Sequence, residues 1–161
     1  MHPTIICATP EDARDIAVMT GELLQEIMDR INVKAFRFHQ GETETRAAEL
    51  LSRGVYYVFL ARDPVTGEAI GFISLYESYA LYTEGAYGTI PELYVRPAYR
   101  SMGVGVALLQ RAKDFAAARG WKRLEVTTPP LPEFDRTLAF YERNTFEISG
   151  GRKLKSDIEV S

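Results

Sequence analysis

Apolar side chains recur at helical spacing in three parts of the chain, and each stretch predicts an amphipathic helix. The first helix opens at Thr9-Pro10, a capping residue followed by one suited to the first turn. The clearest helix covers 103–119, and a third covers 134–143. A shorter helix is expected over 44–53.

β-Branched and aromatic runs separate these helices and predict a sheet. The expected strands cover 5–8, 55–61, 69–76, 89–95 and 123–127, followed by a closing pair at 146–149 and 153–158. The resulting order is βααβββαβαββ, in which hairpins lie beside one strand–helix–strand crossover. We therefore predict one α/β domain over 1–161, with a mixed central sheet of roughly six to seven strands flanked by about four helices.

Composition narrows the class of protein without naming a function. Apolar residues make up 46% of the chain and charged residues 25%, which is typical of a folded globular domain and excludes disorder. Cys7 is the single cysteine, so no disulfide can form within the chain. We expect Cys7 to be a small buried apolar residue, since no base partner for a nucleophile is visible nearby.

Several partners are excluded on the same basis. The net charge of −3 argues against a nucleic-acid surface, and two histidines, His2 and His39, are too few for a multi-histidine metal site. No apolar run approaches the roughly 20 residues that cross a bilayer. No basic segment followed by an apolar one marks a secretory signal, so we expect a cytoplasmic protein with no membrane contact.

The most informative segment is 93–108, where a predicted strand runs through a short loop into a helix opened by glycines. In such a turn several backbone N–H groups converge at the positive end of the helix dipole, which binds phosphate. Gly103 and Gly105 permit close approach of a ligand, and Arg100 adds a cation at the rim. A plain strand–loop–helix turn explains the glycines equally well. A Rossmann fingerprint does not fit, because Leu108 occupies the third glycine position, and no P-loop sequence is present.

Three segments resemble motifs of the GCN5-related N-acetyltransferase (GNAT) family. Arg100-x-x-Gly103-x-Gly105, preceded by Leu-Tyr-Val-Arg-Pro-Ala-Tyr, resembles motif A of that family. The segment 138–146 resembles its Phe-Tyr-Glu motif B, and 69–72 resembles its third strand. The three matches occur in the family's order and with family-like spacing.

Two positions depart from the family pattern. Thr145 stands where the family usually has glycine. A left-handed turn there would cost a non-glycine residue about 1–2 kcal/mol, so we expect a turn of another shape. Phe134 stands where an asparagine often contacts the cofactor's pantetheine arm, which puts that contact in doubt.

The resemblance implies acetyl-CoA as the co-substrate and direct attack by the acceptor amine in a ternary complex. The pyrophosphate would lie on the loop and first helical turn, assisted by Arg100. That cradle comprises Ser101, Met102, Gly103, Val104, Gly105, Val106 and Ala107. The strand edge at Leu93, Tyr94 and Val95 would pair with the pantetheine amides as an extra strand would. A backbone N–H near Leu93 or Tyr94 would polarise the thioester carbonyl.

Two side chains become candidates for proton transfer through the same resemblance. Glu92 lies just before the thioester site, where the family often has a general base; pairing with a cation or with water is the alternative. A carboxyl deprotonates an ammonium against about six pKa units, so Glu92 would act through water, after attack, or by orienting the amine. Tyr141 matches the tyrosine that donates a proton to the departing thiolate, and a core aromatic is the alternative.

The acceptor pocket is expected between the irregular segment 30–42 and an aromatic loop over 77–86. Tyr76, Tyr79 and Tyr82 are candidate substrate contacts, because aromatic rings pack against amine cations and aliphatic chains. Core packing or a dimer interface explains these tyrosines equally well. Charged residues of both signs lie near this expected pocket in the sequence, so they predict no particular charge for the substrate.

These observations predict an acetyl-CoA-dependent N-acetyltransferase that acts on a primary amine of a small molecule or a protein, without a metal. The alternative is a non-catalytic acyl-CoA-binding module of the same fold, which serves as a sensor or structural partner. Transfer of a longer acyl group is a third hypothesis. The apolar closing strands and the family habit predict a homodimer.

Overall fold

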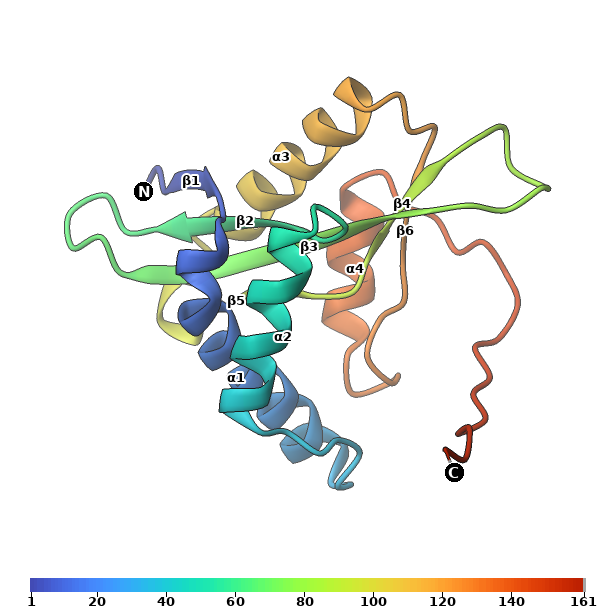
Figure 1. Cartoon of the computed structure of the whole chain (residues 1–161), viewed down its shortest axis with the longest axis horizontal. Helices are drawn as coiled ribbons and strands as arrows, with labels where there is room; N and C mark the ends of the chain where they lie inside the picture. Colours follow the sequence, from blue (N-terminus) through green and yellow to red (C-terminus); the bar gives the residue numbers. More distant parts are fainter. Residues whose placement is uncertain (161) are drawn as a thin grey trace.

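A six-stranded mixed sheet with helices on both faces organises the computed structural model, which describes residues 1–160 (Figure 1). The strands are β1 (Thr4–Cys7), β2 (Tyr57–Arg62), β3 (Ala69–Ser78), β4 (Tyr87–Ile90), β5 (Leu93–Val95) and β6 (Leu124–Val126). The helices are α1 (Ala13–Ile31), α2 (Gln40–Ser52), α3 (Val104–Ala118) and α4 (Asp135–Arg143), with short 3₁₀ turns at Pro10–Asp12 and Pro97–Tyr99. The predicted α/β class and mixed sheet are confirmed.

The strand order is β1-β2-β3-β4-β6, and β5 also pairs with β3. All pairs are antiparallel except β4 with β6, which the α3 crossover makes parallel. The strand predicted over 89–95 is broken at Pro91-Glu92 into β4 and β5, because proline has no N–H to donate to a sheet. Beyond this break β5 stays on β3, and no strand within the described chain pairs with its other edge.

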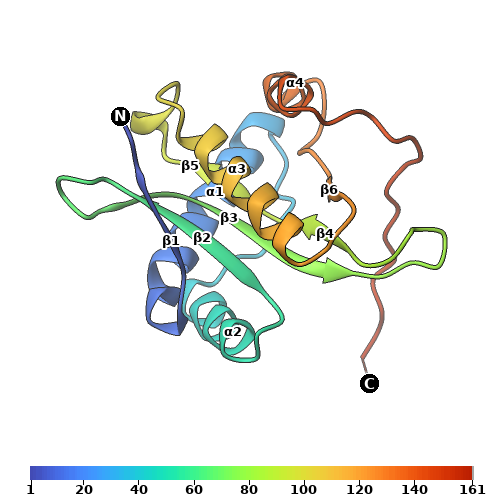
Figure 2. The ribbon, with the colours of Figure 1, turned by 90° about the horizontal axis from the view of Figure 1, so that it is seen from above.

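Helices cover both faces of the sheet (Figure 2), and an apolar core forms on each face. One core joins residues of β2 and β3 to α3 and α4, and includes Phe59, Leu108 and Tyr141. The other joins different residues of the same strands to α1, and includes Met19 and Phe72. Along β2 successive residues belong to opposite cores, so the period-two alternation of a strand supplies apolar side chains to both layers of helices.

The closing strands predicted at 146–149 and 153–158 are not formed, so the order of elements ends at α4. The last backbone hydrogen bond in the described chain is donated by the Phe146 N–H to the Tyr141 carbonyl, and all residues from 147 to 160 are exposed. Gly150 and Gly151 both adopt left-handed φ angles, of 90° and 75°. A two-stranded hairpin with no third strand or helix against it is only marginally stable in water, which explains why the alternating pattern alone does not form strands.

Other boundaries differ by a few residues. Helix α1 continues to Ile31 and α2 begins at Gln40, so the irregular segment predicted over 30–42 is shorter than expected. The His39 ring caps α2 by accepting the Glu42 N–H at Nδ1 (3.2 Å). Cys7 is exposed at the end of β1, so the prediction that it is buried is wrong: it lies on an edge strand, with whose outer side no other strand of the described chain pairs.

None of the helices described over 1–160 combines the length and apolarity needed to cross a bilayer. The same residues contain no cluster of three or more His, Cys, Asp or Glu side chains suited to a metal ion.

Candidate functional site

Glu92 lies at the break between β4 and β5, and hydrogen bonds to both its side chain and its backbone fix it there. Its Oε1 accepts the Tyr56 hydroxyl at 2.5 Å and the Ser74 hydroxyl at 2.6 Å. Its backbone N–H donates to Ser74 Oγ at 3.0 Å. Glu92 was a candidate from the sequence, but neither hydroxyl partner was, because they lie 36 and 18 residues away along the chain. Only the pairing of β2, β3 and β5 brings the three residues together.

The open edge of β5 begins one residue later. Backbone groups of Glu92 and Arg96 bond to β3, through Ser74 N–H to Glu92 C=O (3.0 Å) and Arg96 N–H to Ile70 C=O (2.9 Å). Because backbone groups alternate sides along an antiparallel strand, Tyr94 also faces β3, and Leu93 and Val95 face the open edge. Of the three predicted edge residues, Leu93 therefore presents a free N–H and C=O to the open edge among the described residues, and Val95 a free N–H, since the Val95 carbonyl accepts Arg100 Nε.

The turn into α3 exposes a series of unpaired N–H groups. Gly103 is the N-cap with φ 82°, and Ser101 two residues earlier has φ 63°. From Ser101 to Val106 no N–H donates to another group of the described chain, whereas the Ala107 N–H donates to the Gly103 carbonyl at 3.0 Å. The free donors of the predicted cradle are thus those that precede Ala107, because Ala107 already belongs to the helical ladder.

Arg100 is held by protein groups rather than left free at the rim of the turn. Its Nε donates to the Val95 carbonyl (2.8 Å), and its two terminal nitrogens contact both Glu26 oxygens (3.2 and 2.5 Å). This bidentate pair ties α1 to the loop that carries the free N–H groups. The predicted cation therefore stabilises the loop through these contacts.

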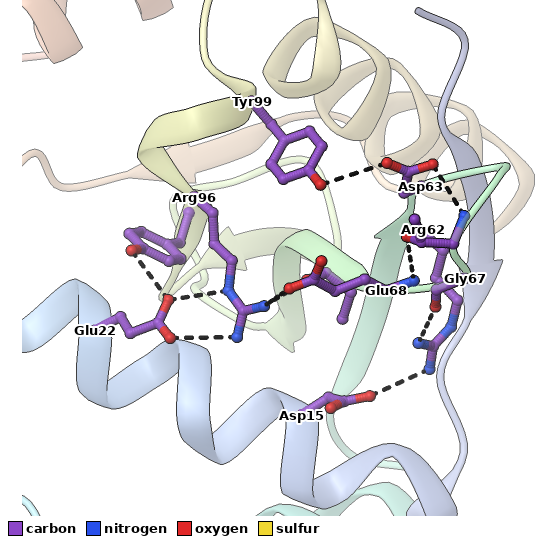
Figure 3. Close-up of polar contacts among 11 residues, drawn as sticks. Asp15, Glu22, Arg62, Asp63, Gly67, Glu68, Arg96 and Tyr99 are labelled. Carbon is purple, nitrogen blue, oxygen red and sulfur yellow. Dashed lines mark hydrogen bonds and ion pairs between the residues drawn. The ribbon is translucent and has the colours of Figure 1, made fainter.

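A second pair repeats the contact one helical turn away. Figure 3 shows Arg96 between Glu22 of α1 (3.1 and 3.2 Å) and Glu68 (3.0 Å). The Tyr94 hydroxyl also donates to Glu22, and burial together with that carboxylate raises the pKa of Tyr94 to about 12. The ion pairs Arg96–Glu22 and Arg100–Glu26 together form an ion-pair ladder that no motif in the sequence identified. Its one signal was the matching i, i+4 spacing of the two acids on α1 and of the two arginines around the loop.

Tyr141 lies on α4 with 5% of its surface exposed. Its ring contacts Phe140 and Phe146 edge to face, with centroids 5.4 and 5.3 Å apart. Burial raises the pKa of Tyr141 above its ordinary value. The hydroxyl has no protein partner among the described residues, and none of their buried side-chain oxygens is unpaired, so this oxygen lies where solvent or a ligand reaches it.

The two departures from the family pattern have different outcomes. Thr145 does adopt the left-handed conformation (φ 73°), contrary to the expectation of another turn shape. Lys113 stabilises it by donating to the Thr145 hydroxyl (3.0 Å) and the Asn144 carbonyl (2.7 Å). Phe134 is buried beneath the Arg30 guanidinium, 5.0 Å from its ring centre, so this position offers no polar group.

The three tyrosines predicted to contact the acceptor lie in different places. The Tyr76 ring is 38% exposed and stacks on Tyr56, with centroids 6.4 Å apart, which puts it beside the Glu92 network. Tyr79 and Tyr82 follow the end of β3, about 13 Å or more beyond Ser74 along the strand, and are 76% and 79% exposed. The loop that carries them projects past the sheet in Figures 1 and 2. Only Tyr76 is brought to the site.

Solved structures with this fold include acetyltransferases. The ribosomal-protein-alanine N-acetyltransferase of Brucella melitensis biovar Abortus 2308 matches with a TM-score of 0.73 at 22% identity, over 97% of this chain and 99% of that one. A predicted acetyltransferase from Clostridium acetobutylicum, whose crystal structure is described with acetyl-CoA, matches with a TM-score of 0.76 at 14% identity, over 96% of each chain. The fold is therefore one that acetyltransferases use.

Sequence comparison defines the family. The model of the acetyltransferase (GNAT) family matches residues 22–146. The aminoalkylphosphonate N-acetyltransferase of Salmonella typhimurium (strain LT2) is 33% identical over 121 residues, which cover 75% of this chain and 71% of that protein. An uncharacterized N-acetyltransferase of Archaeoglobus fulgidus is 30% identical over 60% of this chain and 70% of its own length. The chain belongs to the GNAT family of acetyltransferases.

Proposed function

We propose that this protein transfers the acetyl group of acetyl-CoA to a primary amine by direct attack in a ternary complex. The observation that carries the proposal is two sets of free backbone donors, Leu93 and Val95 at the open edge of β5 and residues 101–106 at the turn into α3. Buried or converging N–H groups without partners favour an anionic or amide ligand. Acetyl-CoA offers both, and it supplies the activated thioester.

The free backbone groups suggest which part of acetyl-CoA each segment binds. Leu93 and Val95 pair with the pantetheine amides along the open edge, as an added strand would. The Leu93 N–H, next to Glu92, polarises the thioester carbonyl, because the Tyr94 N–H faces β3. The N–H groups of Gly103, Val104, Gly105 and Val106, with those of Ser101 and Met102 before them, hold the pyrophosphate.

Glu92 and Tyr141 handle the protons in this proposal. The amine nitrogen bonds to the carbonyl carbon, the carbon–sulfur bond breaks, and one proton leaves the nitrogen while the sulfur gains one. The outward oxygen of Glu92 orients the amine and receives its proton through water after attack, when the nitrogen has become acidic. The Tyr141 hydroxyl, which has no partner among the described residues, donates a hydrogen bond to the departing sulfur, and the thiolate then takes its proton from water.

The choice of acceptor amine is narrowed by the placement of Tyr76 and Glu92 and by the named relative, not by the shape of a pocket. Tyr76 and the Glu92 carboxylate border the same place, which suits an amine attached to a chain or ring that packs on an aromatic face. The name of the Salmonella relative puts aminoalkylphosphonates first among the candidates. Polyamines, amino acids, aminoglycosides and peptides complete the panel.

The test combines binding with turnover. Calorimetry with CoA and acetyl-CoA measures affinity, and thiol release in the presence of each amine measures transfer. Binding together with amine-dependent thiol release supports the enzyme. Binding without thiol release for any amine would establish the non-catalytic acyl-CoA-binding module instead. Failure to bind CoA would overturn both, and faster release with longer acyl-CoA donors would identify a longer acyl group.

We also propose a homodimer built through the segment that follows α4. Four large apolar side chains there are 72–93% exposed: Ile148, Leu154, Ile158 and Val160. Exposed apolar surface of this kind is typical of a contact with another chain. Sedimentation of the full chain tests this, with Leu154→Ser and Ile158→Ser together as the perturbation. A wild-type monomer at all concentrations would refute it.

A further inference from the structure

Ser74 is the one polar side chain buried in the core of the described chain, and all its hydrogen bonds go to Tyr56 and Glu92, here called the Glu92 network. Ser74 is 0% exposed and lies in the middle of β3. Its hydroxyl donates to Glu92 Oε1 (2.6 Å) and accepts the Glu92 N–H (3.0 Å). A hydroxyl in an apolar core costs free energy unless it is hydrogen-bonded. The buried Ser74 hydroxyl therefore serves the Glu92 network, which provides all its hydrogen-bond partners.

Tyr56 supplies the second contact from another strand. It lies just before β2, and its hydroxyl donates to the same Glu92 oxygen at 2.5 Å. Burial, and next the Glu92 charge, raise the pKa of Tyr56 well above its ordinary value, so the phenol stays a neutral donor at working pH. The ring is held in turn by its stack on Tyr76.

The two hydroxyls make the Glu92 carboxylate one-sided. Both donors occupy Oε1, and Oε2 accepts no hydrogen bond from the described chain. Since none of the described buried side-chain oxygens is unpaired, Oε2 lies at the surface. A carboxylate fixed at its backbone and at one oxygen presents the other oxygen in a single direction.

We propose that Tyr56 and Ser74 are positioning residues that hold Glu92 so that Oε2 alone meets the acceptor amine. This inference rests on the proposed acetyl transfer and adds two residues to it that no motif identified. Neither hydroxyl touches the reacting atoms, and both act through Glu92. A purely structural role would instead give the same loss whether or not Glu92 can act.

The test is a double-mutant cycle between Tyr56→Phe and Glu92→Gln, with Ser74→Ala as an independent second arm. Tyr56→Phe is expected to lower kcat/KM for the amine by roughly tenfold to a hundredfold, because misplacement of a catalytic group by about 1 Å has effects of that size. The KM for acetyl-CoA stays within twofold. In the Glu92→Gln background the same change has less than a twofold effect, because the residue it positions is already disabled.

Tyr57→Phe provides the matched control. Tyr57 directly follows Tyr56, and Tyr57→Phe removes the same kind of hydroxyl. The Tyr57 ring, however, packs on Phe115 and Trp121 in the other core, and its hydroxyl contacts Arg119 rather than Glu92. We expect its kcat/KM to stay within twofold of the wild type. Melting temperatures of all variants show that each is folded.

The outcomes separate this inference from the proposed function. Wild-type turnover with equal losses from Tyr56→Phe in both backgrounds, or with no loss at all, overturns the positioning role alone. Absence of wild-type turnover overturns acetyl transfer. In that case crystal structures still decide the positioning: Glu92 is expected to leave its wild-type rotamer in Tyr56→Phe combined with Ser74→Ala, and an unchanged rotamer refutes it.

Discussion

Gly103→Ala tests the cradle at the start of α3 with one added methyl group. Gly103 has φ 82°, and a Cβ built there meets no atom within 4 Å. The cost is therefore conformational rather than steric, about 1–2 kcal/mol for an L-residue in the left-handed region. In a chain of this length that corresponds to a melting temperature lower by about 2–8 °C.

The same strain acts on ligand binding because the loop escapes it by turning its peptide planes. Hydrogen bonds to a charged group contribute about 1.5–3 kcal/mol each, and 1.4 kcal/mol is tenfold in affinity. Loss of one N–H from the row before Ala107 therefore weakens CoA binding by about tenfold or more. Calorimetric titration with CoA measures this directly.

Gly120→Ala is the control at the other end of the same helix. Gly120 has φ 74°, and its added Cβ also meets nothing within 4 Å, so the loss of stability matches that of Gly103→Ala. It is remote from the free N–H groups, so CoA affinity is unchanged. Gly105→Ala should not lower stability as these two variants do. Its added Cβ meets the Phe140 ring at 3.4 Å, an ordinary contact, and alanine has a higher helix propensity than glycine. Equal CoA affinity in Gly103→Ala and Gly120→Ala would refute the assignment of the cradle.

Four further predictions concern stability and catalysis. Tyr141→Phe keeps the ring packing and removes the hydroxyl, so kcat falls by roughly 10²-fold in steady-state assays while acetyl-CoA affinity is kept; full activity would refute the role. Gly71→Ala places a Cβ 2.8 Å from the Tyr94 carbonyl oxygen, so β5 is displaced and urea denaturation shows a loss of about 1–3 kcal/mol. Glu26→Gln weakens the ion pair with Arg100 and lowers the melting temperature relative to the wild type. If this difference in melting temperature were as large in 1 M salt as at low salt, the result would contradict an ionic origin. The Tyr94 contribution to stability is complete below pH 10 and is lost as pH rises toward about 12, because the unfolded chain ionises first; Tyr94→Phe should flatten that loss in denaturation at pH 9 and 11.

The ion-pair ladder between α1 and the loop before α3 explains how a turn with left-handed residues is kept in place. Glu22 and Glu26 lie one helical turn apart and contact Arg96 and Arg100 respectively. Ser101 and Gly103 directly follow, both with positive φ. The strained turn is thus attached to a long helix, so its N–H groups are held in place before a ligand arrives.

Local pattern was sufficient for most elements, because each is determined by neighbours in the sequence. Helical periodicity identified α1, α3 and α4, and β-branched runs identified the strands of the β2–β3 hairpin. Glycines and the preceding strand marked the turn into α3. Pattern failed for 146–158, since an alternating segment becomes a strand only when another strand or a helix covers it.

The functional residues divide along the same line. The sequence by itself marked the glycine turn through its local pattern, and the family resemblance of its motifs made Glu92 and Tyr141 candidates. Tertiary structure alone decided that Tyr56 and Ser74 donate hydrogen bonds to one oxygen of Glu92, since those contacts depend on the register of strands 36 and 18 residues apart in the sequence. It also decided which backbone groups of β5 stay free, because the pairing with β3 assigns every second residue to the open edge.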